Sequence, residues 1–184
     1  LEEALAGRRS VREYRREASL RQAELSQLLW AAQGITNRQG FRTAPSAGAL
    51  YPLEVYAVVG AVAELPPGVY QYQPQGHKLK WRQGGDLRRD LAGLALQQDW
   101  MADAAVVLVI AGVYQRTMSK YGERGRRYVH IEVGHAAQNV YLQAEALGLA
   151  TVAVGAFRDA AVNELLGLRR SEQPLLLLPV GRKP

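Results

Sequence analysis

The sequence predicts a mixed α and β fold in one domain, from its length, its composition and the order of its apolar segments. A chain of 184 residues with 48% hydrophobic and 22% charged residues is ordinary for a globular protein and long enough to bury a core. Apolar runs typical of strands alternate along the chain with segments of helical periodicity, which indicates a mixed class. No low-complexity stretch or Pro/Ser linker divides the chain, so we expect a single domain over residues 1–184.

The N-terminal half predicts one helix followed by strands. The helix begins at Ser19 or Arg21 and continues to Ala32, because leucine and alanine recur there at helical spacing, and Gly34 ends it. A polar, glycine-containing loop over 35–43 follows. The strands predicted in this half are 53–59, 69–72 and 78–81, the last two joined by a turn over 74–76.

The C-terminal half predicts helices around two buried strands. Asp86 can cap a helix over 87–97, and the apolar run 104–111 predicts a strand buried on both faces. We expect a polar, arginine-rich connection over 115–127. The later elements predicted are a long helix over 128–147 ended by Gly148, a strand at 152–154, a helix over 159–166 and a strand over 175–180.

Composition excludes several classes of function. The chain has no cysteine, which excludes disulfides, thiolate metal sites, iron–sulfur clusters and a cysteine nucleophile, and is compatible with the cytoplasm that we expect. The longest apolar run, 104–113, is about half of what a membrane-spanning helix needs, so no membrane association is expected. The net charge of +6 comes from scattered clusters of arginine without interleaved aromatic residues, so we expect no nucleic-acid partner.

Spacing argues against a metal site and a dinucleotide-binding domain. His130 and His135 are separated by roughly 140° around a helix, so their side chains are not placed to bind one metal ion together. Glu132 is expected instead to form a local helix pair with His135. No two glycines stand in the Gly-x-Gly relation of a Rossmann fingerprint.

Several short motifs carry chemistry. Arg8-Arg9-Ser10 and Gly181-Arg182-Lys183 place cations near both ends of the sequence. The segment 45–52, PSAGALYP, joins a glycine-containing loop to a strand and can bring its backbone close to a flat ligand. Further motifs are the hairpin-like segment 68–79, the dipeptide Lys120-Tyr121, the segment EVGHAAQN over 132–139, and GLATVAVGAF over 148–157.

In this order the motifs resemble the FMN-dependent nitroreductase superfamily, most closely its SagB/ThcOx-type dehydrogenase branch, over nearly the whole chain. The resemblance implies an α+β, nitroreductase-like fold with a central, mainly antiparallel sheet flanked by helices. It also implies a homodimer with FMN lodged between the subunits and long helices in the interface. In this family NAD(P)H can act as a transient electron donor stacked over the flavin.

The FMN phosphate requires cationic partners. Arginine suits it because the planar guanidinium matches phosphate oxygens bidentately. Together with the resemblance, this makes Arg8, Arg9 and Arg182 the candidate phosphate ligands, and Ser10 can add a hydroxyl donor. Without the resemblance, the simpler interpretation of these arginines is exposed terminal charge.

The flavin ring requires hydrogen-bond donors where negative charge develops on arrival of a hydride, and backbone N–H groups can supply them. Many nitroreductases carry Glu-Gly where this chain has Gly155-Ala156, which matters little if only the main chain acts. The residues that the resemblance places along the ring are Pro45, Ser46, Ala47 and Gly48, with Gly155 and Ala156 near flavin N5.

Lys120 and Tyr121 are the candidate catalytic residues. Azoline-oxidising enzymes of the SagB/ThcOx branch use a Lys-Tyr pair to take a proton from the heterocycle while the flavin accepts a hydride, which gives an azole. The alternative is an exposed loop dipeptide without a role. The leading interpretation is oxidation of azoline-like rings in a small molecule or modified peptide. The alternatives are an NAD(P)H-dependent reductase of nitro compounds or quinones, and an inactive flavin-binding module.

Overall fold

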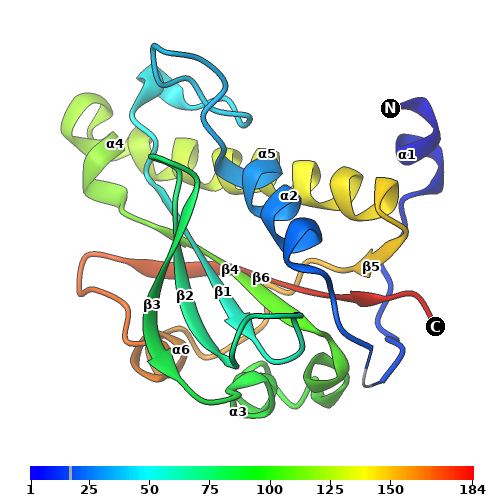
Figure 1. Cartoon of the computed structure of the whole chain (residues 1–184). Coiled ribbons are helices and arrows are strands. Elements are labelled where there is room, and N and C mark those ends of the chain that lie inside the picture. Colours follow the sequence, from blue (N-terminus) through cyan, green and yellow to red (C-terminus); the bar gives the residue numbers. More distant parts are fainter. Residues whose placement is uncertain (17) are drawn as a thin grey trace.

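A six-stranded antiparallel sheet forms the centre of the molecule (Figure 1). The computed structural model describes residues 1–16 and 18–184. The strand order is β3-β2-β1-β4-β6-β5, and every pairing between these strands is antiparallel. The strands are β1 (Leu53–Val59), β2 (Gly68–Gln73), β3 (Lys78–Gly84), β4 (Val106–Gly112), β5 (Leu149–Thr151) and β6 (Gln173–Arg182).

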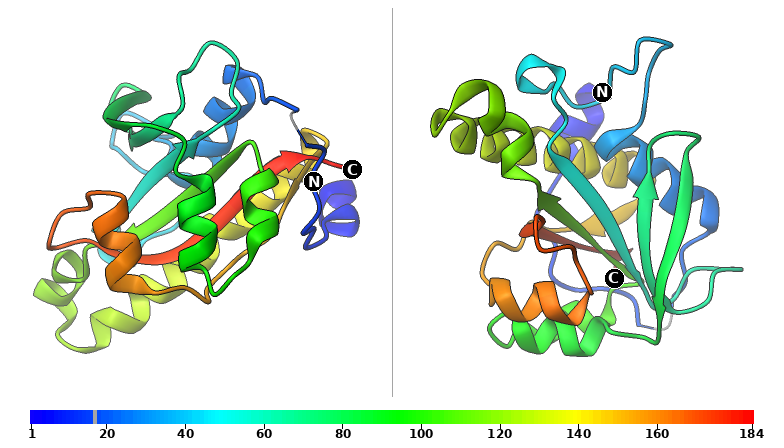
Figure 2. Two further views of the ribbon diagram at one scale, coloured as in Figure 1. Left: turned by 90° about the horizontal axis from the view of Figure 1, so that it is seen from below. Right: turned by 90° about the vertical axis from the view of Figure 1, so that its left-hand side faces the viewer.

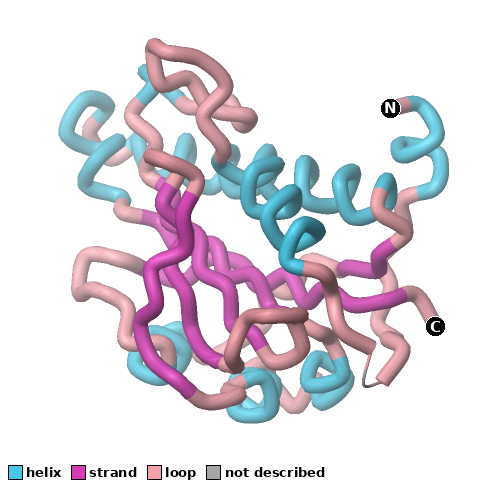
Figure 3. Tube along the Cα trace, viewed as in Figure 1, coloured by secondary structure: helices cyan, strands magenta, loops and turns pink. Residues whose placement is uncertain are grey.

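Helices cover both faces of the sheet, as the tube in Figure 3 shows. α2 and α5 pack on one face, and α3, α6 and a 3-10 turn (Asp99–Asp103) pack on the other. A second 3-10 turn spans Ala47–Ala49. The helices are α1 (Glu2–Gly7), α2 (Gln22–Gln33), α3 (Arg88–Leu94), α4 (Tyr114–Tyr121), α5 (Arg124–Ala146) and α6 (Asp159–Leu165).

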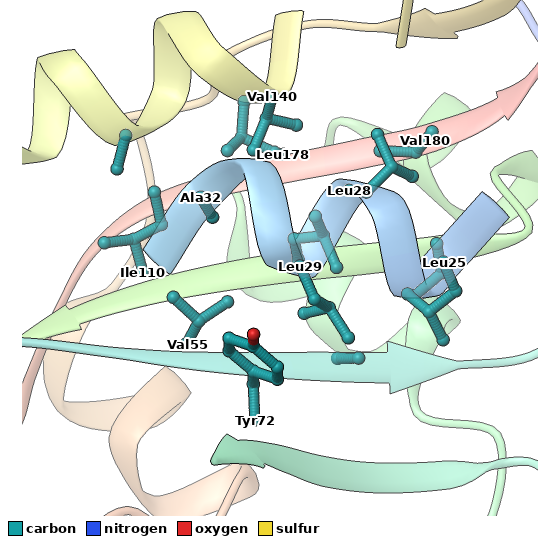
Figure 4. Close-up of a cluster of buried hydrophobic side chains, with 14 of the residues drawn as sticks. Leu25, Leu28, Leu29, Ala32, Val55, Tyr72, Ile110, Val140, Leu178 and Val180 are labelled. Carbon is teal, nitrogen blue, oxygen red and sulfur yellow. The ribbon is translucent and has the colours of Figure 1, made fainter. Parts of the chain in front are cut away.

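The main core lies between the sheet and the α2/α5 layer. Leu25, Leu28 and Leu29 of α2 lie at helical spacing and point toward strands β1, β2, β4 and β6 (Figure 4). All residues of β4 are buried, because the strand has a helical layer on each side. A central strand covered on both faces reads as a continuous apolar run, which is why the sequence predicts it so clearly.

Most of the predicted elements are confirmed, and the predicted bounds of β1 coincide with the observed ones. The connection expected over 115–127 is wrong, since α4 and the first turn of α5 occupy it. The two helices cross closely at Gly125, where a Cβ atom would lie 2.9 Å from the Met118 backbone. The strand expected at 152–154 is also displaced, because β5 ends at Thr151 and Val154 makes only an isolated bridge to Leu177.

Candidate functional site

The loop before β1 meets the C-terminal end of α4. Gly48 has a φ of +64°, and a Cβ atom built on it would lie 2.8 Å from Tyr121 Oη and 3.1 Å from Lys120 Nζ. The Ser46 hydroxyl accepts a hydrogen bond of 2.9 Å from the Tyr51 N–H and so fixes the loop that carries Gly48. The structure therefore brings together two sets of predicted residues, the ring-binding loop and the Lys-Tyr pair, at a contact that requires glycine.

Lys120 and Tyr121 lie in the last turn of α4 rather than in a loop. The Lys120 ammonium is 5.5 Å from the centre of the Tyr121 ring, and the Tyr121 ring packs edge to face on Tyr128 at 5.1 Å. Lys120 is exposed and Tyr121 is half-buried. A phenol held by an aromatic neighbour, with an ammonium beside it and open to solvent, can exchange a proton with a bound ligand.

Glu132 of α5 is a buried acid facing this loop. The residue is 2% exposed, and burial raises its pKa to about 7 while Ser46, Arg42 and Gln33 lower it. Gln33 lies near, yet its Nε2 atom and Glu132 Oε1 both lack a hydrogen-bond partner among the residues that the structure describes. The expected pair with His135 is wrong, because Glu132 lies on the buried face of α5 while His135 is exposed.

A second group of predicted residues gathers near the N-terminus around Tyr141 of α5. The Arg8 guanidinium lies 5.3 Å from the centre of the Tyr141 ring, and Ser10 Oγ is 3.1 Å from Tyr141 Oη. The Ala153 N–H donates to the same phenol oxygen at 2.7 Å. Tyr141 thus orients Ser10 and the segment leading to Gly155. Sequence analysis missed it, since an aromatic residue within an apolar helix face carries no signal of its own.

The other residues of this group are exposed. Within the described residues, Arg9 donates only to the backbone carbonyls of Ala6 and Arg8, at 2.9 and 2.8 Å. The N–H groups of Gly155 and Ala156 donate to no acceptor within the described part of the chain. Exposed guanidinium groups, a hydroxyl and free amides are the donors that a phosphate and a flavin ring edge require, so these residues fit FMN.

Arg182 is committed to an ion pair. Its Nη1 and Nη2 donate to the two carboxylate oxygens of Glu24 at 2.9 and 2.8 Å, and its Nε donates to the Ser19 carbonyl at 3.3 Å. Burial raises the pKa of Glu24, but the hydrogen bonds from Arg182 and Arg21 lower it below the ordinary value. A phosphate at Arg182 would therefore share this guanidinium with a buried carboxylate.

Both ends of the described chain reach one edge of the sheet (Figure 1). Ser10 bridges to Thr151 of β5, and β5 in turn pairs with β6, where Leu149 lies opposite Arg182. The side chains of Arg8 and Arg182 contact α5 and α2, which cover the same sheet face. The sheet thus places the N-terminal and C-terminal segments that carry these arginines side by side, and their shared contact with a phosphate stays a prediction.

The two groups of predicted residues lie at opposite ends of α5 (Figure 2). α4 and the Gly48 loop lie at its N-terminal end, and Tyr141, Ser10 and Arg8 lie toward its C-terminal end. The axial rise to Tyr141 is about 20 Å from Tyr128, which Tyr121 contacts, and about 14 Å from Glu132, which faces the loop. One chain therefore does not bring all the predicted cofactor residues into a single pocket.

Asn139 links three elements near this helix. Its Nδ2 donates to the carbonyls of Ala31 and Thr43, at 3.1 and 3.3 Å, and so ties α5 to α2 and to the loop.

Over residues 1–16 and 18–184, no group of three or more His, Asp or Glu side chains is placed to hold a metal ion. No helix in these ranges combines the length and the apolar character that crossing a membrane requires.

Comparison with known proteins gives consistent results. The family model described as "Nitroreductase family" matches residues 5–182. The curated protein "Putative nitroreductase MJ1384" of Methanocaldococcus jannaschii is 52% identical over 183 residues, which cover 100% of this chain and 91% of that protein.

Two solved structures are similar over most of the chain. A "putative nitroreductase" from Anabaena variabilis superposes with a TM-score of 0.88 at 31% identity, covering 100% of this chain but only 38% of that one. A chain of the E. coli microcin synthetase McbBCD complex, with truncated pro-MccB17 bound, superposes with a TM-score of 0.83 at 25% identity. This match covers 94% of the present chain and 67% of the synthetase chain.

Proposed function

The chain belongs to the nitroreductase family, and we propose that this oxidoreductase uses FMN and works as a homodimer. Bound FMN would supply a two-electron acceptor and donor. Arg8, Arg9, Ser10 and Arg182 would hold the phosphate, and the free amides of Gly155 and Ala156 would serve the flavin ring. The exposed donors around Tyr141 support this assignment.

The loop Pro45, Ser46, Ala47 and Gly48 contacts the ring from the second subunit. The support is the separation of the two groups along α5, which leaves each chain with half of the required residues at each end. A symmetric pair of chains can bring the N-terminal group of one to the loop of the other, and two equivalent sites then form.

The leading reaction is the oxidation of an azoline-like ring to an azole by a SagB-type dehydrogenase. The single observation that carries it is the packing of Lys120 Nζ and Tyr121 Oη against Gly48 of the ring-binding loop. Tyr121, with the Lys120 ammonium beside it, would take the ring proton, and bound FMN would supply the two-electron acceptor. The similarity to a chain of the McbBCD complex, which has a truncated precursor bound, supports a modified peptide as substrate.

Substitution of the pair tests this reaction. With a peptidyl thiazoline as substrate, Lys120→Ala and Tyr121→Phe should each lower kcat by about a hundredfold or more, since each removes a group acting on proton transfer. Bound FMN, measured by its visible spectrum, should not change. Lys80→Ala, an exposed lysine on β3, is the control. Unchanged turnover in both pair variants would contradict azoline oxidation and leave the flavin assignment intact.

A second candidate is an NAD(P)H-dependent reductase of nitro compounds or quinones. It is favoured by the 52% identity to a protein named as a nitroreductase, of which this chain covers 91%. Anaerobic mixing with NADH distinguishes the two, since only the reductase should bleach the flavin rapidly. A protein that binds FMN but catalyses neither reaction would be an inactive flavin-binding module.

A further inference from the structure

A polar cavity of about 580 Å³ opens beside the Gly48 loop. Its walls come from the end of α2, the loop that precedes β1, strands β1 and β2, and α4. Apolar side chains, including Leu50 and Val55, line part of it. The polar residues that matter for its charge are Gln33, Arg42, Tyr51, Glu54, Gln71, Arg116 and, from the turn before β6, Arg169.

The carboxylate of Glu54 is fully engaged. Its Oε1 accepts a hydrogen bond from Arg116 at 2.5 Å, and its Oε2 accepts one from Gln71 Nε2 at 3.0 Å. Arg116 also donates to the Tyr51 carbonyl at 3.0 Å. The charge of Glu54 is therefore balanced by Arg116, and Arg42 forms no ion pair with it.

Arg42 is the half-buried cation that remains, since the exposed Arg169 lies 3.8 Å from the buried Glu172 carboxylate. Its Nη1 donates to Gln33 Oε1 at 2.6 Å, and its guanidinium stacks 4.5 Å from the centre of the Tyr51 ring. It has no carboxylate within 4.0 Å among residues 1–16 and 18–184. Burial lowers the pKa of Arg42, and the nearby acids Glu54 and Glu132 raise it. A partly buried guanidinium with neutral direct partners is a favourable site for an anion.

The cavity adjoins the candidate catalytic pair. Arg116 and Lys120 are four residues apart on α4 and so lie on one side of the helix. The Tyr51 carbonyl that Arg116 holds belongs to the loop that carries Gly48, against which Lys120 and Tyr121 pack. A ligand in the cavity would thus lie next to the reacting end of the site.

We propose that Arg42 recognises the carboxylate of an organic substrate in this cavity. This assignment of the substrate class rests on the proposed function for its position beside Lys120 and Tyr121. A carboxylate fits better than a phosphate, because Arg42 is the one half-buried guanidinium of this cavity without an acidic partner in the described part of the chain, and the nearby Glu54 would repel a second negative charge. The apolar part of the wall accommodates the carbon skeleton that carries the carboxylate.

Benzoate and its neutral analogue benzamide test the proposal by isothermal titration calorimetry, with and without added FMN. We expect benzoate to bind at least about tenfold more tightly, as a charge-assisted hydrogen bond provides. Equal affinity would overturn the proposal. Competition by inorganic phosphate as strong as that of benzoate would overturn the choice of carboxylate.

Substitutions locate the binding. Arg42→Gln should abolish the preference for benzoate, and Arg42→Lys should keep part of it, because it retains the charge but not the planar fork. Arg38→Gln removes an exposed arginine from the same loop and should preserve the preference. A preference that survives in Arg42→Gln would overturn the proposal, and thermal unfolding of each variant verifies the fold.

The titration requires no turnover, so the two proposals fail separately. A benzoate preference that depends on Arg42 in a protein without azoline or nitro activity keeps the cavity assignment and rejects the proposed function. Normal turnover without a benzoate preference rejects the cavity assignment alone. The comparison of the two ligands on the unsubstituted protein needs no variant to fold.

Discussion

The region around Gly48 and the region around Tyr141 hold their predicted residues in different ways. At Gly48, backbone and side chains pack so closely that a single added carbon would meet Tyr121 and Lys120. At Tyr141, the donors are exposed and are oriented by one phenol oxygen. The difference indicates that the first region is preorganised by packing, whereas the second offers charges and amides that await a ligand.

Loss of the ion pair between Arg182 and Glu24 should have the largest effect on stability. Arg182→Gln leaves the buried Glu24 with Arg21 alone and should lower the free energy of unfolding by about 2–3 kcal/mol in urea denaturation. Because the folded-state pKa of Glu24 is lowered, this loss should be full above the unfolded pKa and shrink as pH falls below it.

Lys183→Gln is the matched control for Arg182. It breaks a neighbouring ion pair with Glu145, whose partners are more exposed, and should cost under about 1 kcal/mol. If Arg182→Gln leaves the unfolding free energy unchanged and weakens only FMN binding, then Arg182 belongs to the phosphate site rather than to the fold.

Substitution of Glu132 should have the next largest effect on stability, and this effect should depend on pH. Burial raises its folded-state pKa from 4.5 to about 7, so the unfolded chain loses this proton first and stability falls as pH rises across that window. Glu132→Gln removes the titration. Relative to the unsubstituted protein, it should gain about 2 kcal/mol in unfolding free energy between pH 5 and pH 8.

Urea titrations at several pH values measure this gain. Glu123→Gln at the start of α5 is the control, because that side chain is 80% exposed and should show no such trend. If the difference in unfolding free energy between Glu132→Gln and the unsubstituted protein does not change with pH, then the Glu132 carboxyl is solvated. The contrast between a packed and an open region would then weaken.

Gly48→Ala should have the smallest effect on stability and a clear effect on activity. Alanine at a φ of +64° costs about 1 kcal/mol, and its Cβ would displace Lys120 and Tyr121. Gly40→Ala is matched, since its φ is +84° but its Cβ would meet nothing within 4 Å. Both should lose stability, and only Gly48→Ala should lose turnover. Equal turnover would show that the pair does not need its contact with the loop.

The fold could be predicted where burial leaves a pattern. β1 lies between Pro52 and Gly60 and is apolar except for Glu54, so its bounds are visible in the sequence. α4 was not predicted, because only Thr117 in it is buried and its apolar stripe is short, with Tyr114, Met118 and Tyr121 among polar residues. The sequence indicates elements through the faces they bury, and an element lying on the surface gives little signal.

The sequence predicts which residues belong to the candidate site but not how they lie relative to one another. The motifs identify Ser10, Gly48 and Lys120 individually, yet nothing in their order shows that they divide between two ends of one helix. Arg42 and Arg116 were not predicted at all. They are single polar residues in a loop and on a surface helix, and their shared cavity exists only through the tertiary fold.

The length of α5 sets the distance between the two groups of predicted residues. Each residue inserted into or deleted from this helix would turn one end relative to the other by about 100° and shift it by about 1.5 Å. A register change of that kind would leave each local cluster intact but would prevent two copies from matching in the homodimer that we propose. Indels inside α5 should therefore be far less tolerable than indels in the turn between β2 and β3, which carries no such geometric constraint.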